Sequence, residues 1–259
     1  MSIKPQILAL DFDGVICDGL LEYFQTTQRT YAQIWTDTSV SLLGDMAESF
    51  YQLRPVIETG WEMPILLRAL ILGYDKMKIE LNWPKICQEI VTEDNLNQQE
   101  MMAKLDGVRD NWINNDLDGW LQLHRFYPGI LQKLNTIINS STLLYIVTTK
   151  EGRFVQQLLQ QKGVELPKEN ILGKEVKQPK YETLRQLLPK HNQVPSELWF
   201  VEDLLKTLEK IQQQPDLQEV KLFLADWGYN TQKNRNIAQN KPGINLLSLE
   251  RFNQDYSQW

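Results

Sequence analysis

Short apolar runs alternate along this chain with segments whose hydrophobic positions recur at helical spacing. The apolar runs are typical of strands buried on both faces and lie at 7–12, 143–148, 198–201, 220–225 and, more weakly, 244–247. Helical patterns separate the later runs, at 130–138, 153–161, 181–188 and 204–212. Strands that alternate with helices predict βαβ units, so we expect an α/β fold built on a mostly parallel sheet.

Residues 20–124 follow a different pattern. Amphipathic helical stretches lie there at 21–35, 65–72 and 83–91, and no comparable strand-like run separates them. Proline and glycine mark turns or helix ends at Pro55, Gly60, Pro64 and Gly73. We therefore predict an all-helical domain at 20–124, inserted into an α/β core domain that comprises 1–19 and 125–259.

Composition and charge narrow the class of protein. Of the 259 residues, 42% are hydrophobic, which is enough for a substantial core. A formal net charge of -6 disfavours general binding to nucleic acid or to anionic membranes, so an anionic substrate has to be bound by a local cluster of donors. The two cysteines form no disulfide framework, and we find neither a signal peptide nor a run of about 20 apolar residues. These features predict a cytoplasmic protein and make no prediction of its oligomeric state.

Polar residues end three of the predicted strands: Asp11 and Asp13 the first, Thr148 and Thr149 the second, and Glu202 and Asp203 the third. The carboxyl ends of parallel strands meet at one edge of the sheet, where α/β proteins bind their ligands. Carboxylates as close as Asp11 and Asp13 repel each other unless a cation or hydrogen-bond donors receive them. Because Mg²⁺ prefers a few carboxylates together with phosphate oxygens, this set of residues predicts a magnesium and phosphate site.

Four segments of the chain occur in an order that resembles the haloacid dehalogenase superfamily, which consists mainly of magnesium-dependent phosphatases. They are Asp11-Phe12-Asp13-Gly14-Val15, Tyr145-Ile146-Val147-Thr148-Thr149-Lys150, a lysine that opens a helix, and the acidic pair Glu202-Asp203. Tyr127-Pro128-Gly129, before the second segment, supports the resemblance, and Asp226-Trp227-Gly228-Tyr229 is similar to a segment of phosphoglycolate-phosphatase-like members. The resemblance covers 1–20 and about 125–250, and it implies a three-layer Rossmannoid core with a helical C1-type cap that closes over the site and selects the leaving group.

The resemblance also implies catalytic roles. Asp11 would attack phosphorus to form an aspartyl-phosphate, and Asp13 would protonate the leaving oxygen and then activate water. Thr148 would bind a phosphoryl oxygen, helped by backbone amides near Gly14 and Thr149. We therefore expect a phosphatase that acts on a small phosphate monoester.

The metal site implied by the resemblance is made of acidic residues. Asp11, the carbonyl of Asp13 and Asp203 would hold Mg²⁺, which lets an anionic carboxylate approach an anionic phosphate. Glu202 would be a direct or water-mediated metal partner.

The lysine of the third segment has three candidates in this sequence. We favour Lys180, which follows Pro179 and opens a helical pattern, over Lys177 and Lys174. The chain departs from many relatives at Thr207, where those proteins carry a further acid, and its insertion is longer than phosphoglycolate-type caps usually are.

Several alternatives stay open at this point. Asp11 and Asp13 also suit a turn, Thr148 also suits a helix cap, and Glu202 also suits a surface acid. In the insertion, Arg54 and Trp61 suit packing better than substrate contact. A phosphomutase would share the chemistry of the two aspartates, and a catalytically degenerate member would keep the fold as a binding or scaffold protein.

Overall fold

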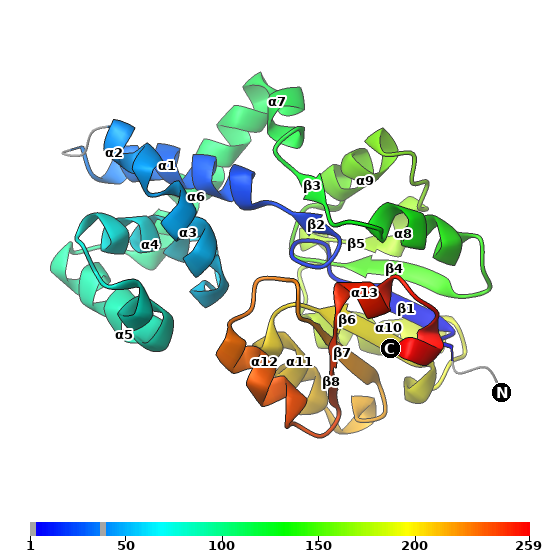
Figure 1. Ribbon diagram of the computed structural model, residues 1–259. Coiled ribbons are helices and arrows are strands. Elements are labelled where there is room, and N and C mark those ends of the chain that lie inside the picture. The colour runs from blue at the N-terminus through cyan, green and yellow to red at the C-terminus, as the bar shows by residue number, and fades with distance from the viewer. Residues whose placement is uncertain (1–3, 37–39) are drawn as a thin grey trace. The chain divides into compact units, whose positions relative to one another are not determined.

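The computed structural model describes residues 4–36 and 40–259 (Figure 1). Two compact units divide the chain, one formed by Met1–Asp18 together with Arg125–Trp259, and the other by Gly19–His124. We call them unit 1 and unit 2. No helix in the described part of the chain is both long enough and apolar enough to span a lipid bilayer.

Unit 1 contains a six-stranded parallel sheet, which confirms the predicted α/β class. Its strands are β1 (Ile7–Leu10), β4 (Leu143–Val147), β5 (Ile171–Leu172), β6 (Leu198–Glu202), β7 (Lys221–Ala225) and β8 (Ile244–Leu247). They lie in the order β5-β4-β1-β6-β7-β8. Ile7 of β1 pairs with Leu143 on one side and with Leu198 on the other. The carboxyl end of β1 is therefore flanked by the carboxyl ends of β4 and β6.

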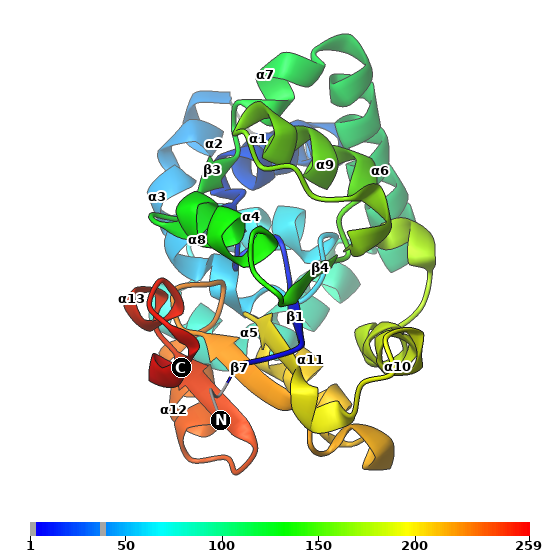
Figure 2. The same ribbon diagram turned by 90° about the vertical axis from the view of Figure 1, so that its right-hand side faces the viewer.

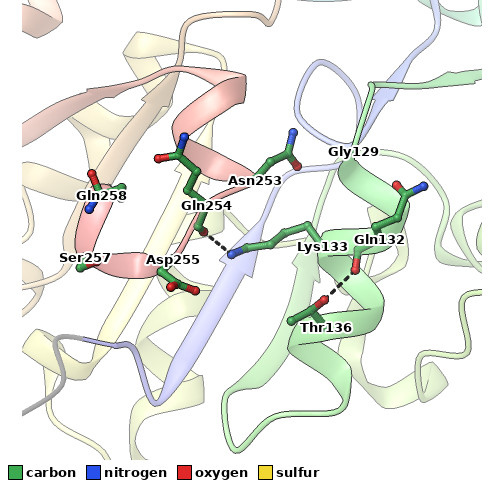
Figure 3. A pocket seen from close by; sticks show the side chains of 9 residues that line it. All are labelled: Gly129, Gln132, Lys133, Thr136, Asn253, Gln254, Asp255, Ser257 and Gln258. Carbon is green, nitrogen blue, oxygen red and sulfur yellow. Dashed lines mark hydrogen bonds between the residues drawn. The ribbon is translucent and has the colours of Figure 1, made fainter.

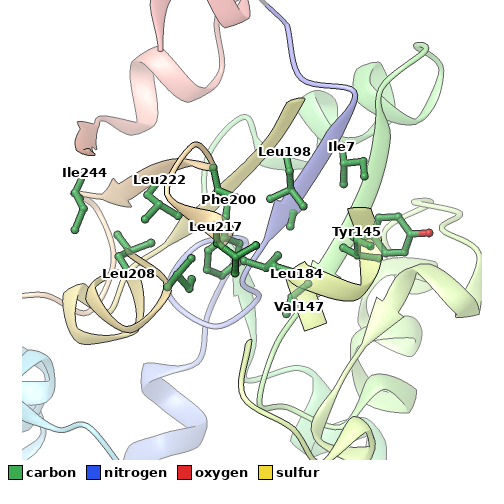
Figure 4. Packing of buried hydrophobic residues seen from close by; sticks show 14 of the residues in the cluster. Ile7, Tyr145, Val147, Leu184, Leu198, Phe200, Leu208, Leu217, Leu222 and Ile244 are labelled. Carbon is green, nitrogen blue, oxygen red and sulfur yellow. The ribbon is translucent and has the colours of Figure 1, made fainter. Parts of the chain in front are cut away.

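Helices cover both faces of this sheet and make the core three-layered. They are α8 (Ile130–Ile138), α9 (Gly152–Gln161), α10 (Lys180–Lys190), α11 (Leu205–Gln212), α12 (Gln232–Gln239) and α13 (Leu249–Phe252). Figure 2 shows α8 and α13 on one side of the sheet and α10 and α11 on the other. On the latter side, Ile7 and Phe200 pack with Leu184 of α10 and Leu208 of α11, all fully buried (Figure 4). Burial on both faces explains why β1 is apolar at every position.

Two short pairings escaped prediction from the sequence. Strand β5 has only two residues, and so do β2 (Cys17–Asp18) and β3 (Arg125–Phe126), which pair with each other antiparallel. An alternating or continuous apolar pattern can be recognised only over at least about four residues. Strands of two residues are therefore too short to be predicted from the sequence. The antiparallel pair of β2 and β3 joins the two chain segments of unit 1.

The described residues of unit 2 form helices and connecting turns without a strand, as predicted for the insertion. Its helices are α1 (Leu20–Ile34), α2 (Val40–Asp45), α3 (Ala47–Leu53), α4 (Glu62–Ile71), α5 (Lys76–Glu93), α6 (Gln98–Asn115) and α7 (Leu117–Leu121). Helix α5 is kinked at Asn82, whose backbone is not helical, two residues before Pro84. Proline removes a backbone donor and clashes with the preceding turn, which accounts for the kink.

A buried carboxylate ties three helices of unit 2 together. Glu22 of α1 is fully buried. It accepts hydrogen bonds from Arg109 of α6 at 2.8 and 3.2 Å and from the indole of Trp120 of α7 at 3.0 Å. The Thr26 hydroxyl donates a further bond at 2.7 Å. With its charge paired and its oxygens bonded, the carboxylate is tolerated inside the unit.

We expect Arg109→Met to lower the free energy of unfolding by about 3–5 kcal/mol, because it leaves the Glu22 charge buried without a cation. Urea denaturation followed by circular dichroism measures the change. Arg153→Met is the matched control, since its pair with Glu151 is mostly exposed, and we expect a loss of about 1 kcal/mol or less. Equal losses in the two variants would show that the Glu22 pair contributes no more than a surface pair.

Candidate active site

The site begins where β1 ends, at a turn that places two aspartates next to the last acidic strand. Asp11 is buried, and its backbone amide still pairs with Val201 of β6 at 2.9 Å. At Gly14 the chain turns with φ of 82°, and a Cβ there would lie 2.0 Å from Asp203 Oδ2. Glycine at this position therefore allows the turn to approach the Asp203 carboxylate.

The amide of Gly14 donates to the carbonyl of Cys17 at 2.8 Å, within the same turn. The structure thus gives Gly14 a steric reason for its place. Its part in phosphate binding stays a prediction, which this hydrogen bond does not favour.

Three acidic side chains converge at the carboxyl ends of β1 and β6. Asp11, Glu202 and Asp203 are all buried, and one carboxylate oxygen from each lies within 4.8 Å of the others. Glu202 is therefore part of the cluster and no surface acid. Burial and the neighbouring Glu202 charge raise the pKa of Asp11 to about 7, and burial also raises the pKa of Glu202. So much buried negative charge is what a cation site provides before the cation binds.

Lys180 is the lysine that faces this cluster. Its ammonium lies 2.9 Å from Asp11 Oδ2 and 2.7 Å from Glu202 Oε2. The lysine is the first residue of α10 and follows Pro179. The two carboxylates raise its pKa above the ordinary value, so it stays charged although it is buried. Lys174 and Lys177, the other candidates, are exposed and line a neighbouring cavity.

In a solution that contains a metal chelator, the Asp11 shift predicts a pH-dependent stability. An acid whose pKa is raised on folding contributes most below its unfolded value of 3.8, and the contribution is lost as the pH rises through about 7. We therefore expect Asp11→Asn to become progressively more stable than the original protein between pH 5 and pH 8. Urea titrations across this range measure the difference, and a difference that is constant with pH would contradict the shift.

Asp13 points to a second cation, Lys150, which the sequence analysis did not single out. The Lys150 ammonium lies 3.2 and 3.4 Å from the two Asp13 oxygens. Lys150 follows β4 by three residues, and its position directly after Thr148-Thr149 was the only signal available. The two aspartates of the turn therefore face different lysines, Asp11 facing Lys180 and Asp13 facing Lys150.

Thr148 and Thr149 differ in exposure at the end of β4. Thr148 is buried, and its hydroxyl accepts the Lys150 amide at 3.2 Å, as expected for a hydroxyl that shapes a turn. Thr149 is exposed. Both threonines line one cavity with Lys180, which places the predicted phosphate-binding side chains along a common space.

The loop after β7 holds the turn and Asp203 in place. The amide of Tyr229 donates to Asp203 Oδ2 at 2.7 Å, and the indole of Trp227 donates to the Val15 carbonyl at 3.1 Å. Asn230 donates to the Asp203 carbonyl at 3.1 Å. A Cβ on Gly228 would lie 2.4 Å from the Gly14 carbonyl oxygen, so this glycine permits the close approach. The segment Asp226-Trp227-Gly228-Tyr229 thus fixes the position of the Asp203 carboxylate and of the turn after β1.

In unit 2, two polar residues of the segment considered for substrate contact bond within the unit. The Arg54 guanidinium donates to the Ile57 carbonyl at 3.1 Å and lies 5.0 Å from the Tyr23 ring centroid. Glu62 accepts the Thr59 hydroxyl at 2.7 Å and the Trp83 indole at 2.8 Å. These bonds favour the packing interpretation of the segment.

A second hollow of the core contains none of the predicted site residues. It lies between α8 and the chain after α13 and is lined by Lys133, Asn253 and Asp255 among others (Figure 3). The Lys133 ammonium in this hollow already has partners within the protein. It donates to the Gln254 carbonyl at 2.5 Å and lies 4.9 Å from the Tyr256 ring centroid. We assign it no role.

Comparisons with known proteins identify the family of this chain. The family model described as haloacid dehalogenase-like hydrolase matches residues 79–213, which is more than half of the chain. The chain belongs to the haloacid dehalogenase-like hydrolases. The match begins inside unit 2 and includes β4, β5 and β6, whereas the turn that contains Asp11 lies before it.

Individual members of this hydrolase family resemble the chain along most of its length. The phosphoglycolate phosphatase of Vibrio parahaemolyticus serotype O3:K6 is 23% identical over 201 residues, which cover 76% of this chain and 75% of that protein. A structure assigned as a phosphoglycolate phosphatase, from Lactobacillus delbrueckii subsp. bulgaricus, aligns with a TM-score of 0.64 at 13% identity and covers 97% of this chain and 98% of that one. The structure of a predicted phosphoglycolate phosphatase from Haemophilus somnus aligns with a TM-score of 0.60 at 17% sequence identity, and the alignment covers 93% of each chain. The structural alignments show a shared fold.

Proposed function

We propose that this hydrolase is a Mg²⁺-dependent phosphatase that cleaves a small phosphate monoester through an aspartyl-phosphate on Asp11. The observation that carries the proposal is the pairing of Asp11 with Lys180 inside a buried acidic cluster. A carboxylate used only for folding gains nothing from two buried acidic neighbours. If Asp11 is a nucleophile, its acidic neighbours serve to bind the metal ion, and Lys180 serves to balance the remaining negative charge.

The donor set of the cluster fits Mg²⁺. Asp11, Asp203 and Glu202 supply oxygen ligands, and the pKa of Asp11 is raised to about 7 where Lys180 is the nearest cation. A divalent cation would satisfy the remaining negative charge. When bound, Mg²⁺ supplies charge neutralisation that allows an anionic carboxylate to meet an anionic phosphate.

The residues of the chain divide the remaining work. Lys180 favours the ionised form of Asp11 and orients it, and its charge also attracts the phosphoryl oxygens. Asp13, positioned by Lys150, donates a proton to the leaving oxygen and then takes one from the attacking water. The Thr148 hydroxyl and the groups around Thr149 hold the phosphoryl group for in-line attack.

Unit 2 is proposed to act as the cap that selects the leaving group. Its place in the chain, between β2 and β3 directly after the nucleophile turn, supports this assignment. Phosphoglycolate is one substrate to test, because the Vibrio parahaemolyticus relative is a phosphoglycolate phosphatase.

The test is release of inorganic phosphate from a panel of phosphate monoesters, with Mg²⁺ and with a chelator. We expect hydrolysis of at least one small monoester that stops when the metal is removed. Transfer of phosphate only in the presence of a sugar bisphosphate would identify a phosphomutase instead. Binding of Mg²⁺ without hydrolysis of any member of the panel would identify a degenerate binding protein.

A further inference from the structure

The two strands through which the chain connects unit 1 with unit 2 are too short to be stable through their own pairing. Strand β2 ends the first chain segment of unit 1 at Asp18, and β3 begins the second segment at Arg125. Each strand contributes only two residues, and Cys17 pairs with Phe126 and Asp18 with Arg125. Even a longer two-stranded pair is marginal in water, so contacts from outside the pair have to hold this one.

Strand β2 is held by the same tyrosine whose backbone holds Asp203. The Tyr229 phenol donates to Asp18 Oδ1 at 2.8 Å, and the Tyr229 amide donates to Asp203 Oδ2 at 2.7 Å. Tyr229 is buried, and a Cβ on Gly14 would lie 3.0 Å from its ring, so the ring also packs against the turn after β1. One residue therefore extends from a proposed metal ligand to the last residue of the connecting strand.

A second phenol lies close to both of these carboxylates. Tyr127 directly follows β3, and its amide donates to the Ile16 carbonyl at 3.2 Å. Burial raises the pKa of the Tyr127 phenol above its ordinary value, and the charges of Asp18 and Asp203 raise it further. Because both carboxylates act on one buried phenol, the connecting strand and the acidic cluster border the same small, poorly hydrated region.

Strand β3 is held by the turn that carries the two aspartates. Phe12 lies between Asp11 and Asp13 and is fully buried. Its ring meets the Phe126 ring edge to face, with the centroids 6.2 Å apart and an interplanar angle of 87°. The Phe12 carbonyl also accepts the Cys17 amide at 2.9 Å. Both connecting strands are thus attached to the surroundings of the acidic cluster, β3 through the turn after β1 and β2 through the loop after β7.

We propose that Tyr229 is a positioning residue that couples the binding of a divalent cation at the acidic cluster to the order of the β2–β3 pair. Without a cation, the buried carboxylates of Asp11, Glu202 and Asp203 repel one another. A cation held between them restrains the Asp203 carboxylate, and with it the Tyr229 backbone and the phenol on Asp18. Coupling of this kind is reciprocal, so the phenol also raises the affinity for the cation. This inference rests on the cation site of the proposed function and does not depend on hydrolysis.

The test measures amide hydrogen exchange in the full chain, with Mg²⁺ alone and with a chelator. Peptides that contain β2 and β3 report on the connecting strands, and a peptide that contains residues 11–14 reports on the turn beside the cluster. In the original protein we expect Mg²⁺ to slow exchange about fivefold or more in both places, because the cation restrains both. Thermal unfolding over a range of Mg²⁺ concentrations gives the affinity for the cation independently of any substrate.

The variant is Tyr229→Phe, which removes the phenol oxygen and keeps both the ring and the amide on Asp203. Asp18→Asn is the conservative partner variant, because its side-chain oxygen can still accept the phenol. Tyr256→Phe is the matched control, since it removes the same atom from a half-buried tyrosine of unit 1 whose ring packs against Trp199.

We expect Tyr229→Phe to lose most of the Mg²⁺-dependent slowing in β2 and β3, to keep it at residues 11–14, and to need about fivefold more Mg²⁺ for half-saturation. Asp18→Asn and Tyr256→Phe should behave as the original protein does. Equal slowing in Tyr229→Phe and the original protein, or no slowing of β2 and β3 in the original protein although Mg²⁺ binds, would refute the coupling and leave the phosphatase function standing. Failure of the original protein to bind Mg²⁺ would overturn the proposed metal site and the coupling with it.

Discussion

Asp11→Asn is expected to reduce hydrolysis of a generic aryl phosphate by at least about 10⁴-fold while the protein stays folded. The amide has nearly the shape of the carboxylate but cannot attack phosphorus. The asparagine amide would replace a carboxylate whose pKa is raised to about 7 by burial and by Glu202, which means that the ionised form of Asp11 is unfavourable in the folded protein. The metal-free variant should therefore be at least as stable as the original protein at neutral pH, so that loss of activity cannot be assigned to unfolding. Stopped-flow or endpoint release of the aryl alcohol, with circular dichroism, measures both properties.

Asp13→Asn separates the two halves of the same mechanism. An aryl alcohol with a low pKa leaves without protonation, so the first half should proceed, and the second half should stall because no base activates water. The expected result is a burst of about one equivalent of aryl alcohol per protein, followed by a slow steady state. Full turnover in Asp11→Asn, or a missing burst together with full steady-state activity in Asp13→Asn, would contradict covalent catalysis by Asp11.

Asp203→Asn is expected to reduce activity by at least about 10²-fold and to raise the Mg²⁺ concentration needed for half-maximal activity. The change removes one charge from the buried cluster but keeps an oxygen that can accept the Tyr229 amide. Loop geometry should therefore survive while metal affinity falls. Activity against Mg²⁺ concentration gives the shift, and thermal unfolding with and without Mg²⁺ gives the loss of binding independently of turnover.

Asp226→Asn is the matched control for this metal-site variant. Asp226 follows β7 at the same edge of the sheet and is partly buried, but it is not a member of the acidic cluster. We expect the Asp226→Asn variant to need the same Mg²⁺ concentration for half-maximal activity as the original protein. Equal shifts in the two variants would mean that Asp203 contributes only general charge and is no metal ligand.

The parallel sheet and the edge at which the candidate site lies were predictable from apolar runs and their polar ends, whereas the order of the strands was not predicted. Ile7 to Leu10 is apolar at every position because helices pack on both faces, and a strand of that kind carries a strong signal. The two residues of β5 carry none, since they lie in the sheet through their pairing with Ile146 and Val147. Tertiary pairing, and not local pattern, determines that strand.

Charge partners within the site were harder to predict than its members. Lys180 was preferred over Lys177 because it opens a helix, and only the structure shows the difference in contacts, with Lys180 lying 2.9 Å from Asp11. The contact of Lys150 with Asp13 joins residues 137 positions apart. The sequence predicted Glu202 as a metal partner and left a surface acid as the alternative, which its burial excludes. Such relations depend on side-chain directions in three dimensions, which a linear pattern does not contain.

The split of unit 1 into two chain segments has a consequence for synthesis. Strand β1 leaves the ribosome before its partners β4 and β6, which lie beyond the helices of unit 2 in the chain. At about 5–20 residues per second, the apolar strand waits on the order of 10 s for its first neighbour. During that interval the nascent helices between them can already fold through local contacts. Asp11 is thus made well before Lys180 and Glu202, the residues that surround it in the folded unit.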